Sequence, residues 1–267
     1  MPIVPLDTLE DPRVADYHAL RDQDLLRNRR LFVAEGRLVV DRIVQDPRYR
    51  VVSVLVSETA CRALEATWSA ATDVPVYVGR AHDFRNLAGL NVHRGCLALV
   101  ERPPALAADA LVAHARTLLV LDRVANPDNV GGVFRNAAAF GVDAVLLTRA
   151  CCDPLYRKSI RTSMGAALGV PFARVDGWSD LRDRLRARGC LTVALTPDAS
   201  AQPLATLAAE SRPEHLALLL GAEGDGLSAD ALAIADRRGR IPIHKAVDSL
   251  NVAVAAGIAL AMLTSKP

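Results

Sequence analysis

Residues 117–141 read TLLVLDRVANPDNVGGVFRNAAAFG. The Leu- and Val-rich start predicts a buried strand over residues 117–121. A polar turn follows, in which Asn129 can cap the helix that begins after it. That helix is predicted over residues 130–140, and its period places Arg135 on the face away from the core. The stretch therefore predicts a strand–turn–helix unit with a polar side chain near the open end of the helix.

The same unit recurs toward the C-terminus. Strands are predicted at 142–148, 191–195, 216–220 and 240–243, and helices at 157–168, 178–188, 228–236 and 249–263. Apolar strands that alternate with helices are typical of a mostly parallel sheet with helices on both faces. In such sheets ligands bind beyond the carboxyl ends of the strands. The loops that leave those ends are therefore the expected place of a functional site.

Two further loops carry unusual residues at predicted strand ends. Gly221–Ser228 reads GAEGDGLS, with three glycines around Glu223. Ile241–Asn251 reads IPIHKAVDSLN and precedes an apolar helix. Each loop by itself also fits an ordinary tight turn or a helix cap, and Arg135 by itself fits a surface arginine on an amphipathic helix.

The order and spacing of these motifs resemble a known family. Asn-x-Gly-x-x-x-Arg, then Gly-x-Glu-x-x-Gly-Leu, then Ile-Pro followed by Ser-Leu-Asn-Val-x-Val-Ala are similar to the three motifs of the SpoU (TrmH) branch of the SPOUT RNA methyltransferases. The segment at residues 157–166 agrees with the family pattern after the first motif, and the resemblance covers about residues 117–265. His244 and Lys245 depart from it, because relatives tend to have small residues there. His244 is expected to be an exposed loop histidine rather than a general base.

The resemblance implies an α/β fold whose SPOUT-type parallel sheet, with helices on both faces, carries a deep trefoil knot. S-adenosyl-L-methionine would bind among the knotted loops. By the family pattern, the positions expected to bind this cofactor are Leu195, Thr196, Gly221, Ala222, Glu223, Ile241, Ile243, Ser249, Leu250 and Asn251. The family usually works as a dimer packed through this domain. A homodimer is therefore expected, with the small-residue C-terminal helix as a packing surface.

The reaction implied by the resemblance is methyl transfer to a ribose 2′-hydroxyl of RNA. The catalytic role falls on Arg135, and the site is shaped by Asn129, Glu223, Ser249 and Asn251. Arginine is a poor base because its pKa lies above about 12. Arg135 is therefore expected to clamp phosphate and to stabilise the developing alkoxide, close to Glu223 and Asn251 and with a cavity among them.

Two prolines at residues 103–104 indicate a domain boundary. Residues 105–267 would form the methyltransferase domain, and residues 1–104 a smaller α/β domain that binds the RNA substrate. The FVAEGR segment at residues 32–37 makes the smaller domain similar to certain ribosomal proteins. In it we expect helices over about 16–30 and 38–45 and strands at 51–57, 74–78 and 95–100. The arginines expected to contact RNA are Arg27, Arg29, Arg30, Arg37 and Arg135.

Composition excludes several classes of protein. A hydrophobic share of 51% over 267 residues supports a core and excludes wholesale disorder, while a net charge of +2 neither demands nor excludes a polyanionic partner. The 5 cysteines lack a zinc-binding spacing, so no metal is expected. The longest apolar run, residues 252–263, is too short to span a bilayer. With no signal sequence at the start, a cytoplasmic protein without a membrane partner is expected.

Several alternatives stay open at the level of sequence. The expected substrate is ribosomal RNA, because the two-part layout resembles members that act on it. Transfer RNA is the close alternative, and an antibiotic-resistance methylase is another. A non-catalytic RNA-binding factor that keeps the fold is a different class. A nicotinamide-dependent oxidoreductase is disfavoured, since residues 129–135 lack the dinucleotide-binding glycine spacing.

Overall fold

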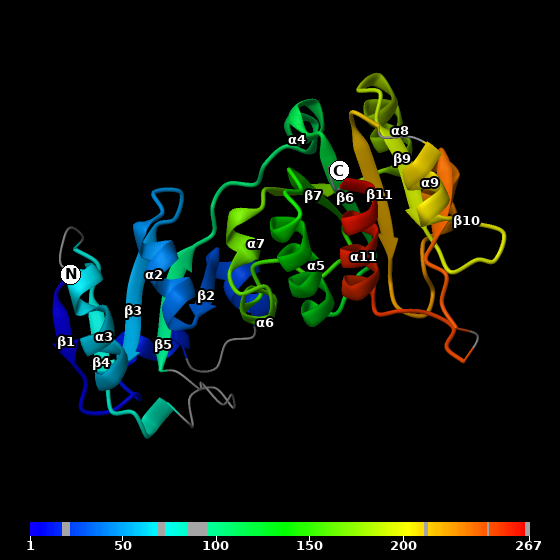
Figure 1. Ribbon diagram of the computed structural model, residues 1–267. Helices are drawn as coiled ribbons and strands as arrows, with labels where there is room; N and C mark the ends of the chain where they lie inside the picture. The colour runs from blue at the N-terminus through cyan, green and yellow to red at the C-terminus, as the bar shows by residue number, and fades with distance from the viewer. Residues whose placement is uncertain (18–21, 69–72, 85–94, 211–212, 245, 265–267) are drawn as a thin grey trace. The chain divides into compact units, whose positions relative to one another are not determined.

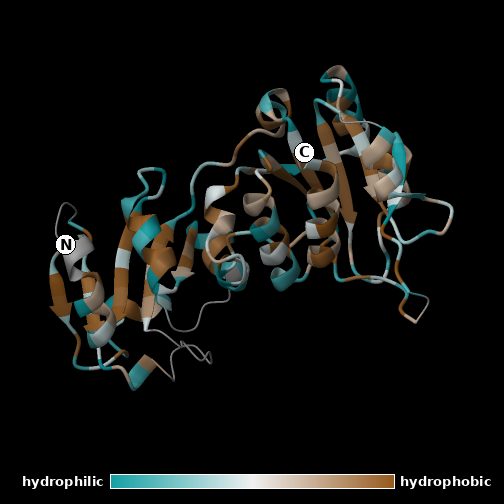
Figure 2. Cartoon of the chain, in the orientation of Figure 1, coloured by the Kyte–Doolittle hydropathy of each residue, from teal (hydrophilic) through white to brown (hydrophobic). Residues whose placement is uncertain are grey.

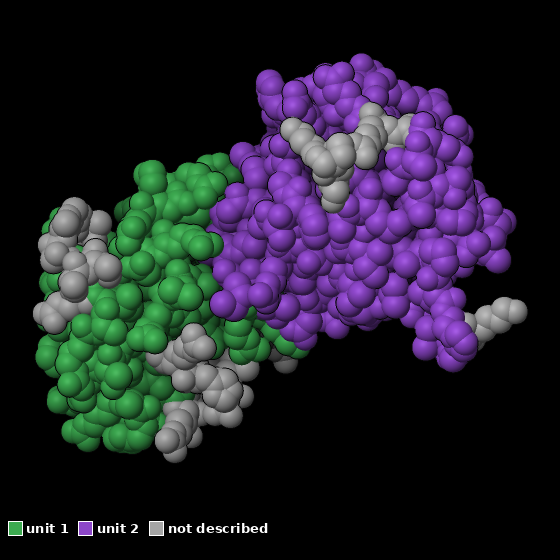
Figure 3. Space-filling view, in the orientation of Figure 1, with its two compact units in different colours: residues 1–104, 155–161 green, residues 105–154, 162–267 purple. Residues whose placement is uncertain are grey.

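The structure is a computed structural model that describes residues 1–17, 22–68, 73–84, 95–210, 213–244 and 246–264. The chain forms two compact units, which Figure 3 shows in different colours. Unit 1 consists of residues 1–104 and 155–161, and unit 2 of residues 105–154 and 162–267. A short segment inside the sequence of unit 2 thus groups with unit 1, which the sequence did not indicate.

Unit 1 is built on a five-stranded sheet in the order β1-β4-β3-β5-β2 (Figure 1). β1, β4 and β3 are parallel, whereas β5 runs antiparallel to both β3 and β2. Its elements are β1 (Ile3–Pro5), the 3-10 helix η1 (Pro12–Tyr17), α1 (Asp22–Asp24), the π-helix η2 (Leu25–Arg29), β2 (Leu31–Glu35), α2 (Arg37–Gln45), β3 (Val51–Ser57), α3 (Glu58–Trp68), β4 (Val76–Gly79) and β5 (Cys96–Glu101).

The helix predicted over residues 16–30 is borne out in type over the described residues 22–29 and in its end at Arg30, although its geometry is not that of one regular α-helix. The described part of this stretch contains the end of η1, then α1 and η2, and residues 18–21 lie outside the described residues. Arg30 ends η2 in the left-handed conformation, with a φ of 53°, and β2 begins at the next residue. Backbone that leaves the right-handed region at one residue cannot continue a helix, so the basic stretch turns into a strand.

Unit 2 contains the predicted parallel sheet. Seven strands in the order β10-β12-β9-β11-β6-β7-β8 pair in parallel throughout, which confirms the expected architecture. Its elements are α4 (Ala108–His114), β6 (Thr117–Asp122), α5 (Pro127–Ala139), β7 (Ala144–Thr148), α6 (Arg157–Thr162), α7 (Ala166–Gly169), β8 (Phe172–Val175), α8 (Trp178–Ala187), β9 (Leu191–Leu195), β10 (Gln202–Pro203), α9 (Leu204–Glu210), β11 (Leu216–Gly221), α10 (Ala229–Ile234), β12 (Arg237–Arg240) and α11 (Val252–Thr264). Helix α6 follows β7 in the sequence, but its residues 157–161 group with unit 1 and only Thr162 groups with unit 2.

Helices cover both faces of this sheet. Alternate residues of the central strands pack with α4, α8 and α10 in one core, for example Leu118 and Leu219 with Leu185. α5 and α11 lie side by side on the other face, where Figure 1 shows them in front of β6 and β11. Figure 2 shows these strands as hydrophobic along most of their length. A strand buried on both faces reads as a continuous apolar run, which is why the sequence revealed the strands so clearly.

Two of the elements predicted after residue 150 differ from the structure. The helix expected over 157–168 is two helices, because Met164 and Gly165 have φ values of 53° and 81° between them. The strand expected at 240–243 is β12, which lies earlier and ends at Arg240. The sequence of β12 is Arg-Arg-Gly-Arg, and such a short strand rich in arginine lacks the apolar pattern by which strands are predicted.

Helix caps also differ from expectation. Asn126, rather than Asn129, caps α5: its side chain accepts a hydrogen bond from Asp128 N at 2.9 Å, and Pro127 occupies the first helical position. Helix α11 begins at Val252 rather than Ser249, and Asn251 caps it. Asn129 and Ser249, which were predicted to cap these helices, therefore have side chains that are not used as caps. The deep trefoil knot stays a prediction of the resemblance.

Candidate functional site

Three chain segments meet at one edge of the unit 2 sheet. Strands β12, β9 and β11 are neighbours, and they end at Arg240, Leu195 and Gly221. Because all three strands are parallel, their carboxyl ends lie at the same edge. The loops that leave them carry two of the motifs singled out in the sequence. The expected convergence of distant loops therefore follows from the strand order.

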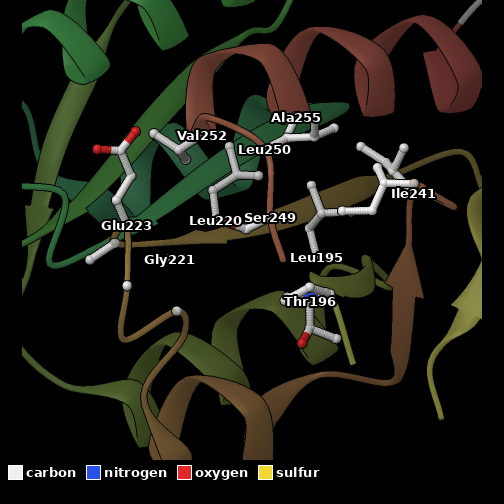
Figure 4. Close-up of a pocket in the computed structure, with 15 residues that line it drawn as sticks. Leu195, Thr196, Leu220, Gly221, Glu223, Ile241, Ser249, Leu250, Val252 and Ala255 are labelled. Carbon is white, nitrogen blue, oxygen red and sulfur yellow. The ribbon is translucent and has the colours of Figure 1, made fainter. Parts of the chain in front are cut away.

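A cavity opens among these loops and the start of α11 (Figure 4). All but one of the residues expected to bind the cofactor line it, and these are Leu195, Thr196, Gly221, Ala222, Glu223, Ile241, Ile243, Ser249 and Leu250. Asn251 is the one that does not. The sequence did not identify the rest of the lining, which consists of Pro197, Leu220, Gly224, Gly226, Val252 and Ala255. Their positions inside or beside the recognised motifs are the only signal that could have found them.

The cavity wall is mostly aliphatic. In Figure 4 the side chains of Leu195, Leu250 and Ile241 lie around it, and the carboxylate of Glu223 stands at one side. Among the described residues that line the cavity, Glu223 is the charged one. A ligand with an apolar, flat part and a positive charge would match this lining.

The glycine loop, residues 221–226, is shaped by its own backbone. Gly226 N donates to Ala222 O at 3.0 Å and so closes a tight turn. Gly224 and Gly226 have φ values of 88° and 66°, which favour glycine. A β-carbon at Gly221 would lie 2.2 Å from the carbonyl carbon of Gly226. The glycines therefore allow two backbone segments of the turn to approach closely. The conformation of this turn determines the position of Glu223.

Asn251 links this loop to helix α5. Its Nδ2 donates to Oε1 of Glu223 and to Oδ1 of Asn129, each at 2.8 Å. Its Oδ1 accepts from Ala253 N at 2.9 Å and thereby caps α11. Asn129 is buried within α5, whereas Glu223 and Asn251 are exposed. The structure thus brings together three residues that were predicted to shape the site, from three elements far apart in the sequence.

Arg135 and Ser249 stand outside this hydrogen-bonded group. Arg135 is exposed on α5, as its place on the helical period predicted, and it makes no hydrogen bond or ion pair with the described residues. It lies six residues beyond Asn129, about 9 Å further along the helix axis and on a different side of it. The expected close approach of Arg135 to Glu223 and Asn251 is therefore not a direct contact. Ser249 lines the cavity.

Close packing fixes α5 against α11. A β-carbon at Gly132 would lie 2.6 Å from Cβ of Ala253, and Asn136 Nδ2 donates to Ala253 O at 2.5 Å. Gly257 also lies against the Asn136 side chain. The glycine at 132 therefore admits a neighbouring helix rather than a ligand. This packing holds Asn129 and Asn251 at a constant separation.

In unit 1 the predicted RNA-contacting arginines separate into two places. Arg27, Arg29 and Arg30 lie exposed just before β2, and Arg29 pairs with Asp16. Arg37 lies beyond the opposite end of β2, as the first residue of α2. A five-residue strand spans about 16 Å, so Arg37 is not part of the same cluster.

The strand pairing instead brings Arg102 next to Arg30 and places Arg50 across β5 from it. Arg102 N donates to Arg30 O at 2.7 Å, and Glu101 N donates to Arg50 O at 2.9 Å. The side chain of Arg50 is 81% exposed and pairs with Glu101. The sequence could not place Arg102 beside Arg30, or Arg50 on the other side of β5, because the pairing of β2, β5 and β3 decides both positions.

The described residues offer neither a metal site nor a membrane-spanning helix. Within the described ranges, His, Cys, Asp and Glu side chains form no group of three or more that could hold a metal ion. No helix in the described part of the chain is long and apolar enough to cross a membrane.

Comparison with known proteins is consistent with this geometry. The chain is 40% identical over 254 residues to an uncharacterized tRNA/rRNA methyltransferase of Mycobacterium bovis, covering 94% of this chain and 88% of the relative. It is 27% identical over 255 residues to the 23S rRNA (guanosine(2553)-2'-O)-methyltransferase RlmP of Bacillus subtilis, covering 95% and 96% of the two chains.

A solved structure extends the likeness to both units. The AdoMet-bound rRNA methyltransferase of Sinorhizobium meliloti superposes with a TM-score of 0.81 at 26% identity, covering 98% of this chain and 97% of the other. Residues 116–261, which contain the cavity and the Asn129–Glu223–Asn251 group, match the SpoU rRNA Methylase family. The family match is supported by a relative that covers nearly the whole chain and by a solved structure with the same fold. The chain therefore belongs to the SpoU rRNA Methylase family.

Proposed function

We propose that this chain transfers a methyl group from S-adenosylmethionine to a ribose 2′-hydroxyl of RNA. The observation that carries the proposal is the cavity at the carboxyl ends of β9, β11 and β12, whose lining coincides with the positions expected for the methyl donor. The named relatives support it, because the B. subtilis protein is a 2′-O-methyltransferase and the S. meliloti structure contains AdoMet.

The cavity residues fit this cofactor chemically. The donor has a flat adenine base and a positively charged sulfonium and amine, while the cavity offers aliphatic walls and one carboxylate, Glu223. Leu195, Ile241 and Leu250 would hold the adenine, and the exposed backbone of the glycine loop would supply polar partners. When bound, S-adenosylmethionine supplies an electrophilic methyl group on sulfur.

The chain's own residues would orient the reactants. Asn251 fixes the carboxylate of Glu223 by donating a hydrogen bond to it, and the same amide group is fixed by Asn129. Attack on the methyl group requires the ribose oxygen in line with the departing sulfur, so such positioning can supply several kcal/mol of the barrier. Arg135 is assigned to phosphate and to the developing alkoxide. It takes no proton, because a guanidinium stays protonated.

The proposed substrate is ribosomal RNA rather than transfer RNA. The support is the B. subtilis relative, which matches this chain over nearly its whole length and is named for 23S rRNA. The M. bovis relative is named for both RNA classes, so transfer RNA is the alternative. Residues 1–104 would select the RNA through the arginines before β2, since phosphate contacts by arginine position RNA and unpaired bases provide specificity.

A homodimer through unit 2 is part of the proposal. Helix α11 is composed almost wholly of small and aliphatic residues, yet only Val252, Ala256, Ala259 and Leu260 are buried. Val254 on the same helix is 51% exposed. An apolar helix with an incompletely covered surface is suited to packing against a second copy. Light scattering during size-exclusion chromatography would give twice the chain mass if this is correct.

The test of the reaction is a map of 2′-O-methyl positions in total RNA from cells with and without the gene. Loss of one modification in 23S rRNA would support the proposal and name the substrate. A modification lost from transfer RNA would move the substrate to that class. Identical maps, combined with no methylation of either RNA by the purified protein, would favour a non-catalytic RNA-binding factor.

Replacement of Arg135 tests the assignment of catalysis. Arg135→Ala should lower the methylation rate by at least about 100-fold, as loss of a transition-state donor does, and leave the Kd for S-adenosylmethionine nearly unchanged. Arg186, exposed on α8, provides the matched control, and Arg186→Ala should keep the wild-type rate. An R135A rate equal to that of wild type would remove Arg135 from the mechanism.

A further inference from the structure

Arg123 follows the last residue of β6 and has a φ of 58°. This left-handed conformation is costly for a residue with a β-carbon and is usually filled by glycine. Arg123 N donates to Oγ1 of Thr148 at 3.0 Å, which holds the backbone in this state. A strained backbone at the carboxyl end of a strand points to a use for the side chain that it carries.

The side chain of Arg123 contacts the glycine loop without lining the cavity. Its Nη2 donates to Gly226 O at 3.2 Å, and its Nη1 lies 3.9 Å from the carboxylate of Asp225. Its Nε lies 3.6 Å from Oδ2 of Asp122. That same oxygen accepts from Ser228 N at 2.8 Å, and Asp122 is almost fully buried. Two consecutive residues therefore hold the loop at Gly226 and Ser228.

The atoms that Arg123 holds are the ones that set the shape of the cavity wall. Gly226 N closes the loop on Ala222 O, and the carbonyl of Gly226 is the group that accepts from Arg123. Gly221 packs so closely on Gly226 that no β-carbon fits between them. A shift of Gly226 would therefore move both the floor of the cavity at Gly221 and the carboxylate of Glu223, which Asn251 holds from the other side.

We infer that Arg123 is a positioning residue for the methyl-donor site: its guanidinium fixes the carbonyl of Gly226 and so keeps the glycine loop in its binding shape. The inference rests on the proposed function, because it concerns the affinity of the same cavity for S-adenosylmethionine. Arg123 itself does not line that cavity. Its effect is transmitted through the backbone of the loop.

Two substitutions separate this role from general stability. Arg123→Gly removes the guanidinium and suits the left-handed backbone, so the variant should melt at or above the wild-type temperature. Arg123→Lys keeps a positive donor that can reach a carbonyl, although without the planar geometry of arginine. Arg149 supplies the matched control: it stands on the neighbouring strand end, is exposed, pairs with Asp176 and makes no contact with the loop among the described residues.

The measurement is isothermal titration of each purified variant with S-adenosylmethionine, together with its melting temperature and its methylation kinetics. We expect Arg123→Gly to raise Kd and KM for the donor by about tenfold, the effect of one lost charged hydrogen bond, with kcat within about twofold of wild type. Arg123→Lys should recover part of the affinity. Arg149→Gly should bind as the wild type does.

Each contrary outcome has its own meaning. Wild-type protein that fails to bind S-adenosylmethionine contradicts the proposed function, and the inference falls with it. Wild-type binding with an unchanged Kd in Arg123→Gly contradicts the inference alone. A melting temperature that falls along with affinity in both Arg123 variants would make Arg123 a residue of general stability and would also overturn it.

Discussion

Asn251 uses the two ends of one amide for two purposes. The oxygen caps α11, and the nitrogen bridges Asn129 and Glu223. Arg135 is different: it is exposed, and its contribution depends on RNA that the chain would bind. The proposed site thus combines a preorganised hydrogen-bonded group with one exposed arginine, whose proposed partner is the RNA substrate.

Asn251→Asp separates the two purposes of the amide. The carboxylate can still accept from Ala253 N and cap α11, but it cannot donate to Glu223 and it repels that carboxylate. We expect the methylation rate to fall by about tenfold or more, while the free energy of unfolding changes by less than about 1 kcal/mol. Urea denaturation and single-turnover kinetics measure the two quantities. A rate near that of wild type would show that the bridge to Glu223 is dispensable.

The glycines of the loop differ in what they tolerate. A β-carbon at Gly221 would collide with backbone atoms of Gly226, whereas one at Gly224 would meet nothing within 4 Å. Gly224→Ala should therefore cost about 1 kcal/mol for the left-handed conformation without displacing the backbone of the loop. Gly221→Ala should displace the loop and raise the Kd for S-adenosylmethionine by well over about tenfold. Similar binding constants for both variants would contradict this account of the loop.

The decisive pair of elements is α5 with α11, because these helices hold Asn129 and Asn251. Gly132→Ala improves helix propensity by up to about 1 kcal/mol, but the added methyl meets Ala253 on α11 and should cost about 1–3 kcal/mol. The variant should therefore be less stable than wild type. Ala253→Gly should restore stability only in the Gly132→Ala background, and a double-mutant cycle of chemical denaturation measures that coupling. Additive effects would mean that the two helices do not touch there.

For the whole molecule, the cysteines report on the unfolding of each unit. All 5 are buried, and burial raises the pKa of Cys96 to about 12 and also raises the pKa of Cys151 and Cys190. Because the thiolate is the reactive form, native protein should resist alkylation at neutral pH. Burial keeps the pKa of Cys96, Cys151 and Cys190 above its ordinary value in the folded state, so raising the pH toward 9 should increase the labelling of these thiols in unfolded chains far more than in folded ones.

Titration with urea then tests whether the units unfold separately. Cys61 and Cys96 lie in unit 1, and the other three cysteines lie in unit 2. Units with their own cores should expose their thiols as two groups, each at its own urea concentration. Mass spectrometry of alkylated peptides distinguishes the groups. Simultaneous labelling of all five would show one cooperative transition instead.

Sequence alone determined the features that depend on local pattern. The apolar strands of unit 2, the outward position of Arg135 on α5 and the placement of polar loops after strands all follow from periodicity, because burial on a sheet or a helix face repeats at fixed intervals. The motifs then indicated which loops to associate, and the cavity formed by those loops contains nearly all of the expected cofactor positions.

Only the tertiary structure decided which groups meet. The bond from Asn251 to Asn129 joins residues 122 positions apart, and the contact of Arg123 with Gly226 joins residues 103 positions apart. Neither contact can be predicted from the neighbouring sequence, because the partner of a side chain at the edge of a sheet depends on strand order and register. The same reason explains why Asn126 displaced Asn129 as a cap and why Arg30 adjoins Arg102 rather than Arg37. Periodicity reports which face is buried, but hydrogen bonds between distant segments exist only after the chain has folded.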